Sequence, residues 1–97
     1  MSIKKDPWNE ADAQALLEAL LLLKDREETQ YFLRDLLTEK EIAEFSLRWK
    51  VARMLSKGMP YTTIVKETGM SSTTIARVQK WLTAGKGGYR LILDRQK

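Results

Sequence analysis

The sequence contains no cysteine and no histidine among its 97 residues. Without cysteine the chain has no disulfide and no thiolate metal ligand, and without histidine it lacks the commonest neutral metal ligand. The same absences remove the thiol nucleophile and the side chain best suited to proton transfer near neutral pH, although carboxylates and lysines remain. The composition therefore disfavours an enzyme and predicts that the protein holds no metal.

Long apolar segments are also missing. The longest uninterrupted apolar run is Ala19–Leu23, and the sequence begins with polar residues. A membrane-spanning helix needs about 20 apolar residues, and a cleavable signal peptide also has a longer apolar stretch. We therefore expect a cytoplasmic protein with no membrane partner.

The length suits one domain, and no linker, internal repeat or low-complexity tract divides the chain. We predict a single domain over residues 1–97. Domains of this size bury limited surface and often gain stability from disulfides, metals or self-association. Because the first two are disfavoured, a second copy of the chain is the remaining candidate.

Apolar residues recur at helical spacing and no strand-like alternation is found, so the sequence predicts an all-α fold. The expected helices span about residues 9–23, 25–36, 38–57, 61–68, 72–82 and 89–95. Asn9 is predicted to cap the first helix, and Tyr31, Phe32, Leu33 and Leu36 of the second are predicted to point inward. Residues 9–57 are assigned to the core and to dimerisation, and residues 89–95 to a C-terminal helix.

The first expected helix has an unusually broad apolar surface. Leu16, Leu20 and Leu23 form one row at helical spacing, and Leu17 with Leu21 forms the next. So wide an arc in a short protein is buried in the chain's own core or against a second subunit. We expect the second subunit.

The charges are divided between the two halves of the chain. Residues 1–47 contain 6 Lys and Arg against 11 Asp and Glu, whereas residues 48–97 contain 11 against 2. A basic half attracts a polyanion and steers its approach, while the acidic half is free to pack or to face solvent. The alternative reading is a solvated basic surface without a partner.

Residues 60–82 have the features of a helix-turn-helix. Such a motif needs a glycine where the chain reverses, here Gly69, and apolar residues at fixed offsets that hold the two helices together. The residues at those offsets are Ile64, Met70, Ile75 and Val78. Ser71 is the expected N-cap of the second helix.

The second helix of such a motif enters the major groove with its N-terminus first, so its leading side chains are short, polar or basic. The candidates there are Ser71, Ser72, Thr73, Thr74, Arg77 and Lys80, and those on the first helix are Thr62, Thr63 and Lys66. Hydroxyls and helix N-terminal amides can hold phosphates. The alternative is a helical hairpin that serves only packing, but the acid-free run from Thr68 to Leu93 favours double-stranded DNA.

Several blocks of residues, in the same order, resemble the tryptophan repressor (TrpR) family. They are Leu36-Leu37-Thr38, Glu41, Arg48, Val51-Ala52-Arg53-Met54-Leu55, Gly58, Ile64, Thr68-Gly69 and Thr74-Ile75-Ala76-Arg77-Val78. Further segments, Leu23-Lys24-Asp25, Glu27-Glu28, Phe32, Asp35-Leu36, Gly88-Tyr89 and Leu93-Asp94-Arg95, are more narrowly similar to its YerC/YecD branch. The similarity extends over nearly the whole chain.

The resemblance implies an intertwined, all-helical homodimer whose two reading helices lie about one DNA turn apart on a near-palindromic operator. It implies a transcription regulator, a repressor, that is associated with the nucleoid of a prokaryotic cell when bound. The competing hypothesis is a helical adaptor that binds another protein through its leucine-rich N-terminal helix and has a vestigial reading helix. RNA binding and an enzyme are weaker options.

In the tryptophan-binding members of the family, two arginines hold the ligand. By position these correspond to Arg48 and Arg77, with Thr38 near the ligand amine. Small residues of those members are replaced here by Val78 and Trp81, whose bulk occupies such a pocket. We therefore expect no cofactor and hypothesise that DNA binding does not require tryptophan; tryptophan or a similar small effector is the alternative.

Overall fold

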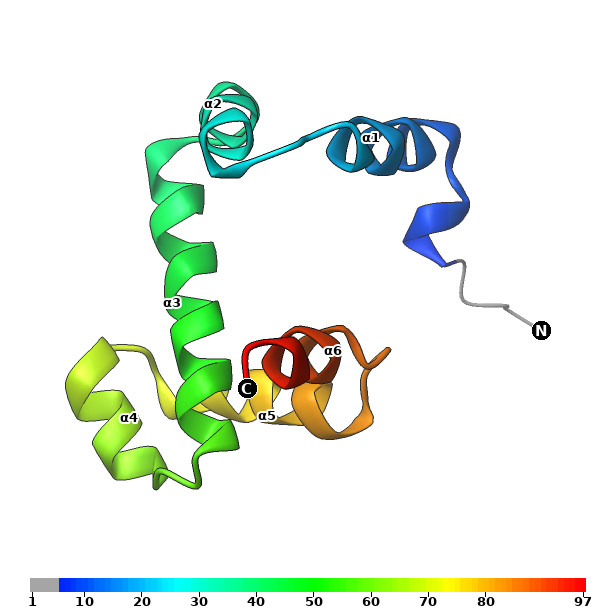
Figure 1. Ribbon diagram of the computed structural model, residues 1–97. Helices are drawn as coiled ribbons and strands as arrows, with labels where there is room; N and C mark the ends of the chain where they lie inside the picture. The colour runs from blue at the N-terminus through cyan, green and yellow to red at the C-terminus, as the bar shows by residue number, and fades with distance from the viewer. Residues whose placement is uncertain (1–5) are drawn as a thin grey trace. The chain divides into compact units, whose positions relative to one another are not determined.

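The computed structural model describes residues 6–97, and the regular structure within this range is entirely helical. The elements are η1 (Pro7–Asn9), α1 (Ala11–Leu21), α2 (Arg26–Leu36), α3 (Glu39–Ser56), α4 (Tyr61–Thr68), α5 (Ser72–Ala84) and α6 (Gly88–Arg95) (Figure 1). The predicted all-α class is confirmed. The described chain divides into two compact units, an N-terminal unit up to Thr38 and a C-terminal unit from Glu39 to Lys97. The assignment of both to one domain stays a prediction.

The start of the N-terminal unit corrects one expectation. Asn9 does not cap α1; it ends the 3-10 turn η1, where its N–H donates to the carbonyl of Asp6 at 3.0 Å. Asp6 is the capping residue, because its carboxylate accepts from the N–H of Trp8 at 3.0 Å. Pro7 explains the shift, since its fixed φ suits the first position of a helical turn. The longer helix α1 then begins at Ala11, after Glu10, which makes no side-chain cap.

Helix α2 begins as the sequence suggests. The Asp25 carboxylate accepts from the N–H of Glu28 at 2.9 Å, and the Glu28 carboxylate accepts from the N–H of Lys24 at 3.0 Å. One turn later, the hydroxyl of Tyr31 donates to the Glu27 carboxylate at 2.6 Å, and this hydrogen bond raises the pKa of the Tyr31 hydroxyl. Polar contacts therefore define the first two turns of α2.

No residue from Asp6 to Thr38 is buried in the single chain. Leu21 and Leu22, at the end of α1, are 85% and 76% exposed. Tyr31 and Leu36 are also exposed, so the expectation that they point into a core is wrong for the chain alone. The described N-terminal unit thus has helices but no fully buried side chain of its own.

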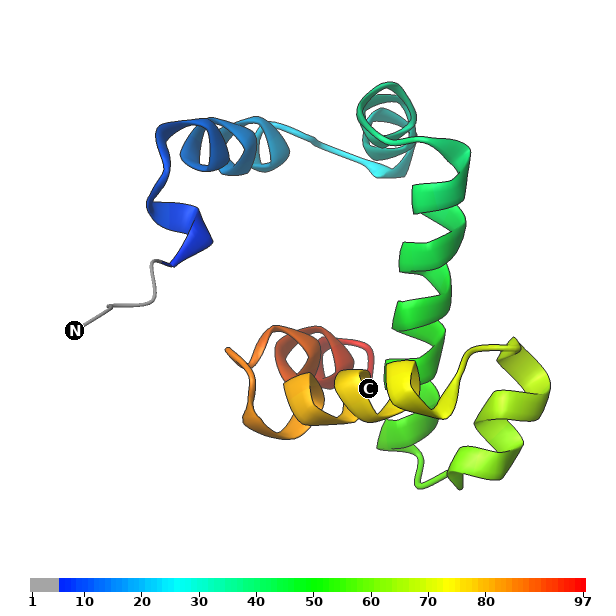
Figure 2. The ribbon, with the colours of Figure 1, turned by 180° about the vertical axis from the view of Figure 1, so that it is seen from behind.

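The C-terminal unit contains the hydrophobic core. Its buried residues are Val51, Ala52, Met54, Ile64, Ile75, Val78 and Leu82, contributed by α3, α4 and α5. Helix α3 contacts both α4 and α5, and α5 contacts α6. Figures 1 and 2 show α5 crossing α3 near the C-terminal end of α3. The α4–α5 pair is therefore anchored to one long helix.

Helix α6 is held to α3 by an aromatic pair. The rings of Trp49 and Tyr89 stack with centroids 6.1 Å apart and an interplanar angle of 24°. Such offset-stacked pairs contribute about 0.5–1.5 kcal/mol beyond the area that they bury. Tyr89 follows Gly87, whose φ of 86° provides the left-handed entry into α6. The stack fixes the position of α6 within the C-terminal unit.

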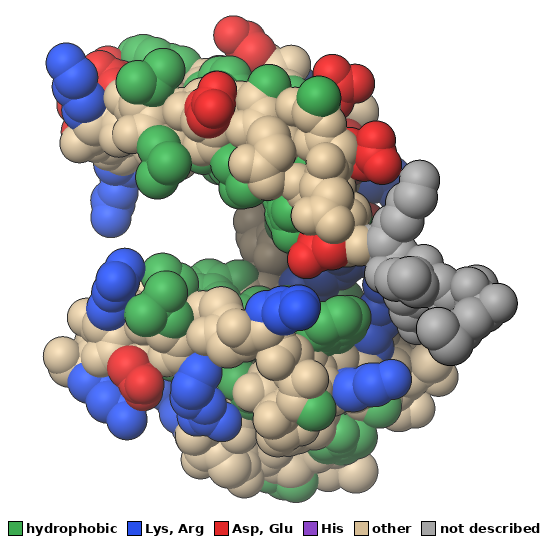
Figure 3. Space-filling model, turned by 90° about the vertical axis from the view of Figure 1, so that its right-hand side faces the viewer, with side chains coloured by type: hydrophobic (Ala, Val, Ile, Leu, Met, Phe, Trp, Pro, Cys, Tyr) green, Lys and Arg blue, Asp and Glu red, His purple; other side chains and the backbone are tan. Residues whose placement is uncertain are grey.

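Surface charge differs between the two units. From Glu39 to Lys97 the sequence has 12 Lys and Arg against 5 Asp and Glu. On the face drawn in Figure 3, Lys and Arg side chains predominate on the C-terminal unit, and acidic side chains are more frequent on the N-terminal unit. Within residues 6–97, no helix is long and apolar enough to cross a membrane.

Candidate nucleic-acid interface

Helices α4 and α5 are joined by a short turn whose conformation requires glycine. Gly69 caps α4 with φ 72° and ψ 2°, in the left-handed region, and its N–H donates to the carbonyl of Val65 at 2.9 Å. Thr68 braces the turn on both sides: its hydroxyl donates to the carbonyl of Ile64 at 2.7 Å and accepts from the N–H of Met70 at 3.2 Å. A side chain at position 69 would meet no neighbour, so backbone strain and not space selects glycine.

Ser71 caps the N-terminus of α5, as predicted. Its hydroxyl accepts from the N–H of Thr74 at 3.2 Å and lies 3.1 Å from the Thr74 hydroxyl. The carbonyl of Ser71 accepts the first helical bond, from the N–H of Ile75 at 3.1 Å. The first turn of α5 has no acidic residue. An uncompensated positive helix end is therefore presented beside two hydroxyls.

The predicted apolar residues hold the motif to the core. Ile64 and Ile75 are 0% exposed and Val78 is 4% exposed, while Met70 packs against them from the turn. Val65, which follows Ile64, is 37% exposed and takes no part in this cluster. The core thus determines which face of α5 is buried and which remains at the surface.

The residues proposed to contact DNA lie on the surface of the motif. Thr62, Lys66, Ser71, Ser72, Thr73, Arg77 and Lys80 are exposed, and Thr63 and Thr74 are partly buried. Thr74 also interacts with Ser71, so of the two threonines it is the less available. Their accessibility agrees with a contact role, but contact with DNA stays a prediction for each of them.

Arg48 and Arg77, proposed as ligand residues, line one cavity of about 270 Å³. The other lining residues are Glu44, Met70, Thr74, Val78, Trp81 and Tyr89. All belong to the C-terminal unit. Thr38 belongs to the N-terminal unit, and its place beside a ligand stays a prediction.

Within this cavity Arg48 already has partners. Its Nη2 lies 2.9 Å from Oε1 of Glu44, one helical turn earlier, and its guanidinium lies 5.6 Å from the centre of the Phe45 ring. Sequence reasoning missed Glu44 and Tyr89 as cavity residues. The four-residue spacing of Glu44 and Arg48 is the signal that predicts their ion pair, whereas the position of Tyr89 depends on the stack with Trp49.

One further contact shapes the cavity. Trp81, which lines it, is followed one turn later by Gly85 at the end of α5. A Cβ atom added to Gly85 would lie 2.8 Å from Cε3 of the Trp81 ring and still closer to the Trp81 carbonyl oxygen. The ring therefore rests directly on the glycine backbone.

No group of three or more acidic side chains in residues 6–97 is placed to hold an ion. The groups proposed to contact DNA are hydroxyls, guanidinium and ammonium groups and a free helix end, which suit phosphate and base edges.

A helix pair joined by a glycine turn, with its second helix anchored in a core and polar at its exposed N-terminus, defines a helix-turn-helix protein of DNA-binding character. Residues 11–97 match the model of the family described as Trp repressor protein. The chain belongs to the Trp repressor family, a family of DNA-binding regulators, and is a YerC-like member of it.

Individual relatives agree with this assignment. The chain is 43% identical over 97 residues to YerC, an uncharacterised protein of Bacillus subtilis (strain 168), covering 100% of this chain and 91% of YerC. It is similar to the crystal structure of a TrpR-like protein from Eubacterium eligens ATCC 27750, with a TM-score of 0.86, 36% identity and 92% of each chain covered. It is also similar to a "putative Trp repressor" from Staphylococcus aureus, with a TM-score of 0.85, 39% identity and 95% of each chain covered.

Proposed function

We propose that the protein is a sequence-specific repressor of transcription that binds double-stranded DNA as a homodimer on a near-palindromic operator. The observation that carries the proposal is the exposed N-terminal end of α5, which is polar, capped by Ser71 and without acidic residues. A helix end of this kind approaches base edges and phosphates without electrostatic repulsion. Membership of a family of DNA-binding regulators supports it.

The reading end of α5 has two kinds of donor. The N–H of Thr74 is occupied by the Ser71 hydroxyl, whereas the N–H groups of Ser72 and Thr73 precede Ile75, the first helical donor, and remain available for a phosphate. Thr73 is exposed beside them and can reach a base edge. Lys80, two turns further along α5, is also exposed and suits the phosphate backbone. Thr73 is therefore assigned to sequence recognition and Lys80 to affinity.

The exposed apolar surface of α1 and α2 supports the homodimer. Residues 6–38 contain no buried side chain, and three large apolar or aromatic side chains are widely exposed: Leu21 by 85%, Leu22 by 76% and Tyr31 by 63%. Apolar surface of this extent is usually covered by a partner. If a second copy of the chain covers this surface, the assembly has two-fold symmetry, which matches the two half-sites of a palindrome.

Two substitutions in α5 test sequence recognition. On an operator selected from genomic fragments, Thr73→Ala is expected to lower the preference for operator over random DNA by about 5- to 150-fold, corresponding to about 1–3 kcal/mol for one specific base contact. Lys80→Ala is expected to weaken operator and random DNA equally, because a phosphate contact carries no sequence information. Titration of both duplexes by fluorescence anisotropy measures the two effects.

The matched control is Thr83→Ala, an exposed threonine near the opposite end of the same helix whose hydroxyl donates to the carbonyl of Gln79 at 3.0 Å. It should leave both affinities unchanged. Equal losses on operator and random DNA for Thr73→Ala would contradict base reading at this position, and no loss on either DNA for any α5 variant would contradict the proposed interface.

We propose further that DNA binding needs no tryptophan. In the cavity of Arg48 and Arg77, the Glu44 carboxylate lies 2.9 Å from Arg48, where the carboxylate of an amino acid ligand would compete with it. Trp81 and Val78 add bulk to the walls of the same cavity. Both features disfavour an indole amino acid, the first by charge and the second by volume.

Calorimetry tests this hypothesis. The wild-type protein is expected to bind free tryptophan no more tightly than about 1 mM, only about 4 kcal/mol of binding free energy. Its affinity for operator should be the same with and without the amino acid. The double variant Glu44→Gln, Trp81→Ala, which removes the competing charge and the bulk, is expected to bind tryptophan more tightly than the wild type. A micromolar site in the wild type is the result that sinks the hypothesis.

A further inference from the structure

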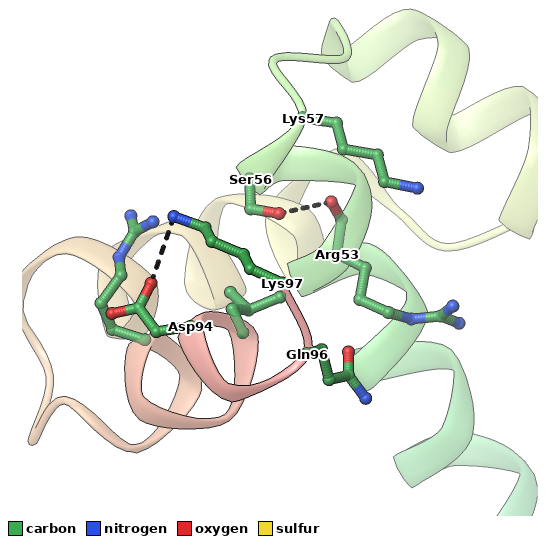
Figure 4. A pocket seen from close by; sticks show the side chains of 8 residues that line it. Arg53, Ser56, Lys57, Asp94, Gln96 and Lys97 are labelled. Atoms are coloured by element: carbon green, nitrogen blue, oxygen red, sulfur yellow. Dashed lines mark hydrogen bonds and ion pairs between the residues drawn. The ribbon is translucent and has the colours of Figure 1, made fainter.

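A second cavity, away from the predicted DNA contacts, lies between the C-terminal end of α3 and helix α6. Its volume is about 420 Å³, within the lower range of small-molecule sites. Four of its lining residues are cationic: Arg53, Lys57, Arg90 and Lys97. Figure 4 shows Arg53 and Lys57 extending to the same side of α3, and Lys97 folded back over α6.

The positive charge in this cavity is mostly uncompensated. Asp94 is the one acidic side chain among the lining residues. It pairs with Lys97 at 3.4 Å, and this pair is open to solvent, with the two side chains 58% and 81% exposed. In the described part of the chain, Arg53, Lys57 and Arg90 have no ion pair. Three cations without an ion pair thus line one cavity that has a single acidic side chain.

Helix stability does not explain this grouping of cations. Cations near the C-terminus of α3 are favoured by the helix dipole, which accounts for Arg53 and Lys57 taken singly. However, these two residues are four positions apart on one helical face, where like charges repel. Arg90 lies in the first turn of α6, where the dipole disfavours a cation. A bound anion would relieve both unfavourable arrangements.

The cavity also offers a neutral donor. The amide of Gln96 lines the cavity, and in Figure 4 it lies on the same side as the guanidinium of Arg53. The hydroxyl of Ser56 is already used, since it donates to the carbonyl of Arg53 at 2.7 Å. Guanidinium, ammonium and amide groups are the donors that bind phosphoryl oxygens with charge-assisted hydrogen bonds.

We propose that this cavity is a binding site for a phosphoryl anion with two or more negative charges, held by Arg53, Lys57 and Arg90. The site lies outside the helix-turn-helix, and its existence does not depend on the DNA-binding proposal. A diphosphate group of a free metabolite and two neighbouring phosphates of a DNA strand have the same chemistry. The experiment separates these sources.

The probe is inorganic diphosphate, titrated into the full chain labelled with ¹⁵N at constant ionic strength. Saturable amide shifts are expected at residues 56–57 and 93–97, with little change near Thr73. Arg53→Gln should raise the dissociation constant for diphosphate about tenfold or more, as expected for loss of one charge-assisted hydrogen bond. The matched control is Arg95→Gln, which removes a cation from the same helix region outside the cavity and should change it less than about twofold.

Equal weakening by Arg53→Gln and Arg95→Gln, or shifts that grow linearly without saturation, would overturn the site in favour of general charge screening. Unchanged shifts of Ile64 and Ile75 in each variant establish that the fold is kept. In a second arm, an operator duplex is added before diphosphate. If DNA shifts the same amides and diphosphate displaces it there, the natural source is the DNA backbone; if DNA leaves them unchanged, it is a free phosphorylated molecule.

Discussion

The affinity of the protein for its operator is expected to fall about a thousandfold or more when the salt concentration rises from about 50 to about 200 mM. That slope corresponds to about six phosphate contacts, because each neutralised phosphate releases condensed counterions into solution. The exposed cations of α4, α5 and the following turn are Lys66, Arg77, Lys80 and Lys86. Doubled in a homodimer they exceed six, so the required charge is present. Anisotropy titrations over a salt series give the slope directly.

The control for this prediction compares two variants that remove positive charge, one in the helix-turn-helix and one in the N-terminal unit. Lys66→Gln with Lys80→Gln should reduce the logarithmic slope by about two for each protomer. Lys24→Gln, at an exposed lysine before α2 in the acidic N-terminal unit, should leave it unchanged. A flat salt dependence for the wild type would favour the competing adaptor, which binds protein and not DNA.

The second large effect is expected on dimerisation, when charge is introduced at the C-terminal end of α1. Leu21→Glu with Leu22→Glu should raise the dimer dissociation constant at least ten-thousandfold. Burial of one leucine contributes about 1.5–3 kcal/mol, and a two-fold interface loses four of them. Sedimentation equilibrium is expected to show monomers, and operator affinity should fall with the dimer.

The matched variant is Asn9→Glu with Gln30→Glu, which adds the same two negative charges at exposed polar positions of the N-terminal unit. It should remain dimeric. Because Val51, Ile64 and Ile75 lie in a core that these changes do not touch, unfolding of the C-terminal unit should be unaffected in both variants. A dimeric Leu21→Glu, Leu22→Glu protein would show that the apolar end of α1 is not the interface.

The helix-turn-helix was predictable because its signals are local. Gly69 adopts the left-handed conformation and Ser71 the capping role that their residue types favour. Helix α4 has the predicted bounds, and α5 continues two residues beyond the predicted end at 82. Asn9 was predicted wrongly because Asp6, another residue type that favours capping, comes just before Pro7. The chain forms the short turn η1 there with Asp6 as its cap, and Asn9 ends that turn. Local rules identify caps reliably only when one candidate is present.

Features that depend on distant parts of the chain were harder to predict. Tyr31 and Leu36 have helical spacing with their apolar neighbours, yet spacing does not say whether the buried face exists within one chain. Tyr89 reaches the cavity of Arg48 and Arg77 through a stack with Trp49, forty positions earlier in the sequence. The grouping of cations from α3 and α6 likewise requires the fold. The sequence therefore predicted the helices, but it did not predict which of them lie against one another.

The contact between Gly85 and Trp81 limits how the sequence of this cavity can change. Any side chain at position 85 would clash with the backbone carbonyl oxygen of Trp81 and with its indole ring, which lines the cavity. A smaller residue at position 81 would enlarge the cavity and remove the contact with the ring. Position 85 stays restricted even then, because a Cβ atom there would still clash with the backbone carbonyl oxygen of residue 81, which every residue type at that position carries. The cavity wall can therefore vary at position 81, whereas glycine at position 85 is fixed by the backbone of α5 itself.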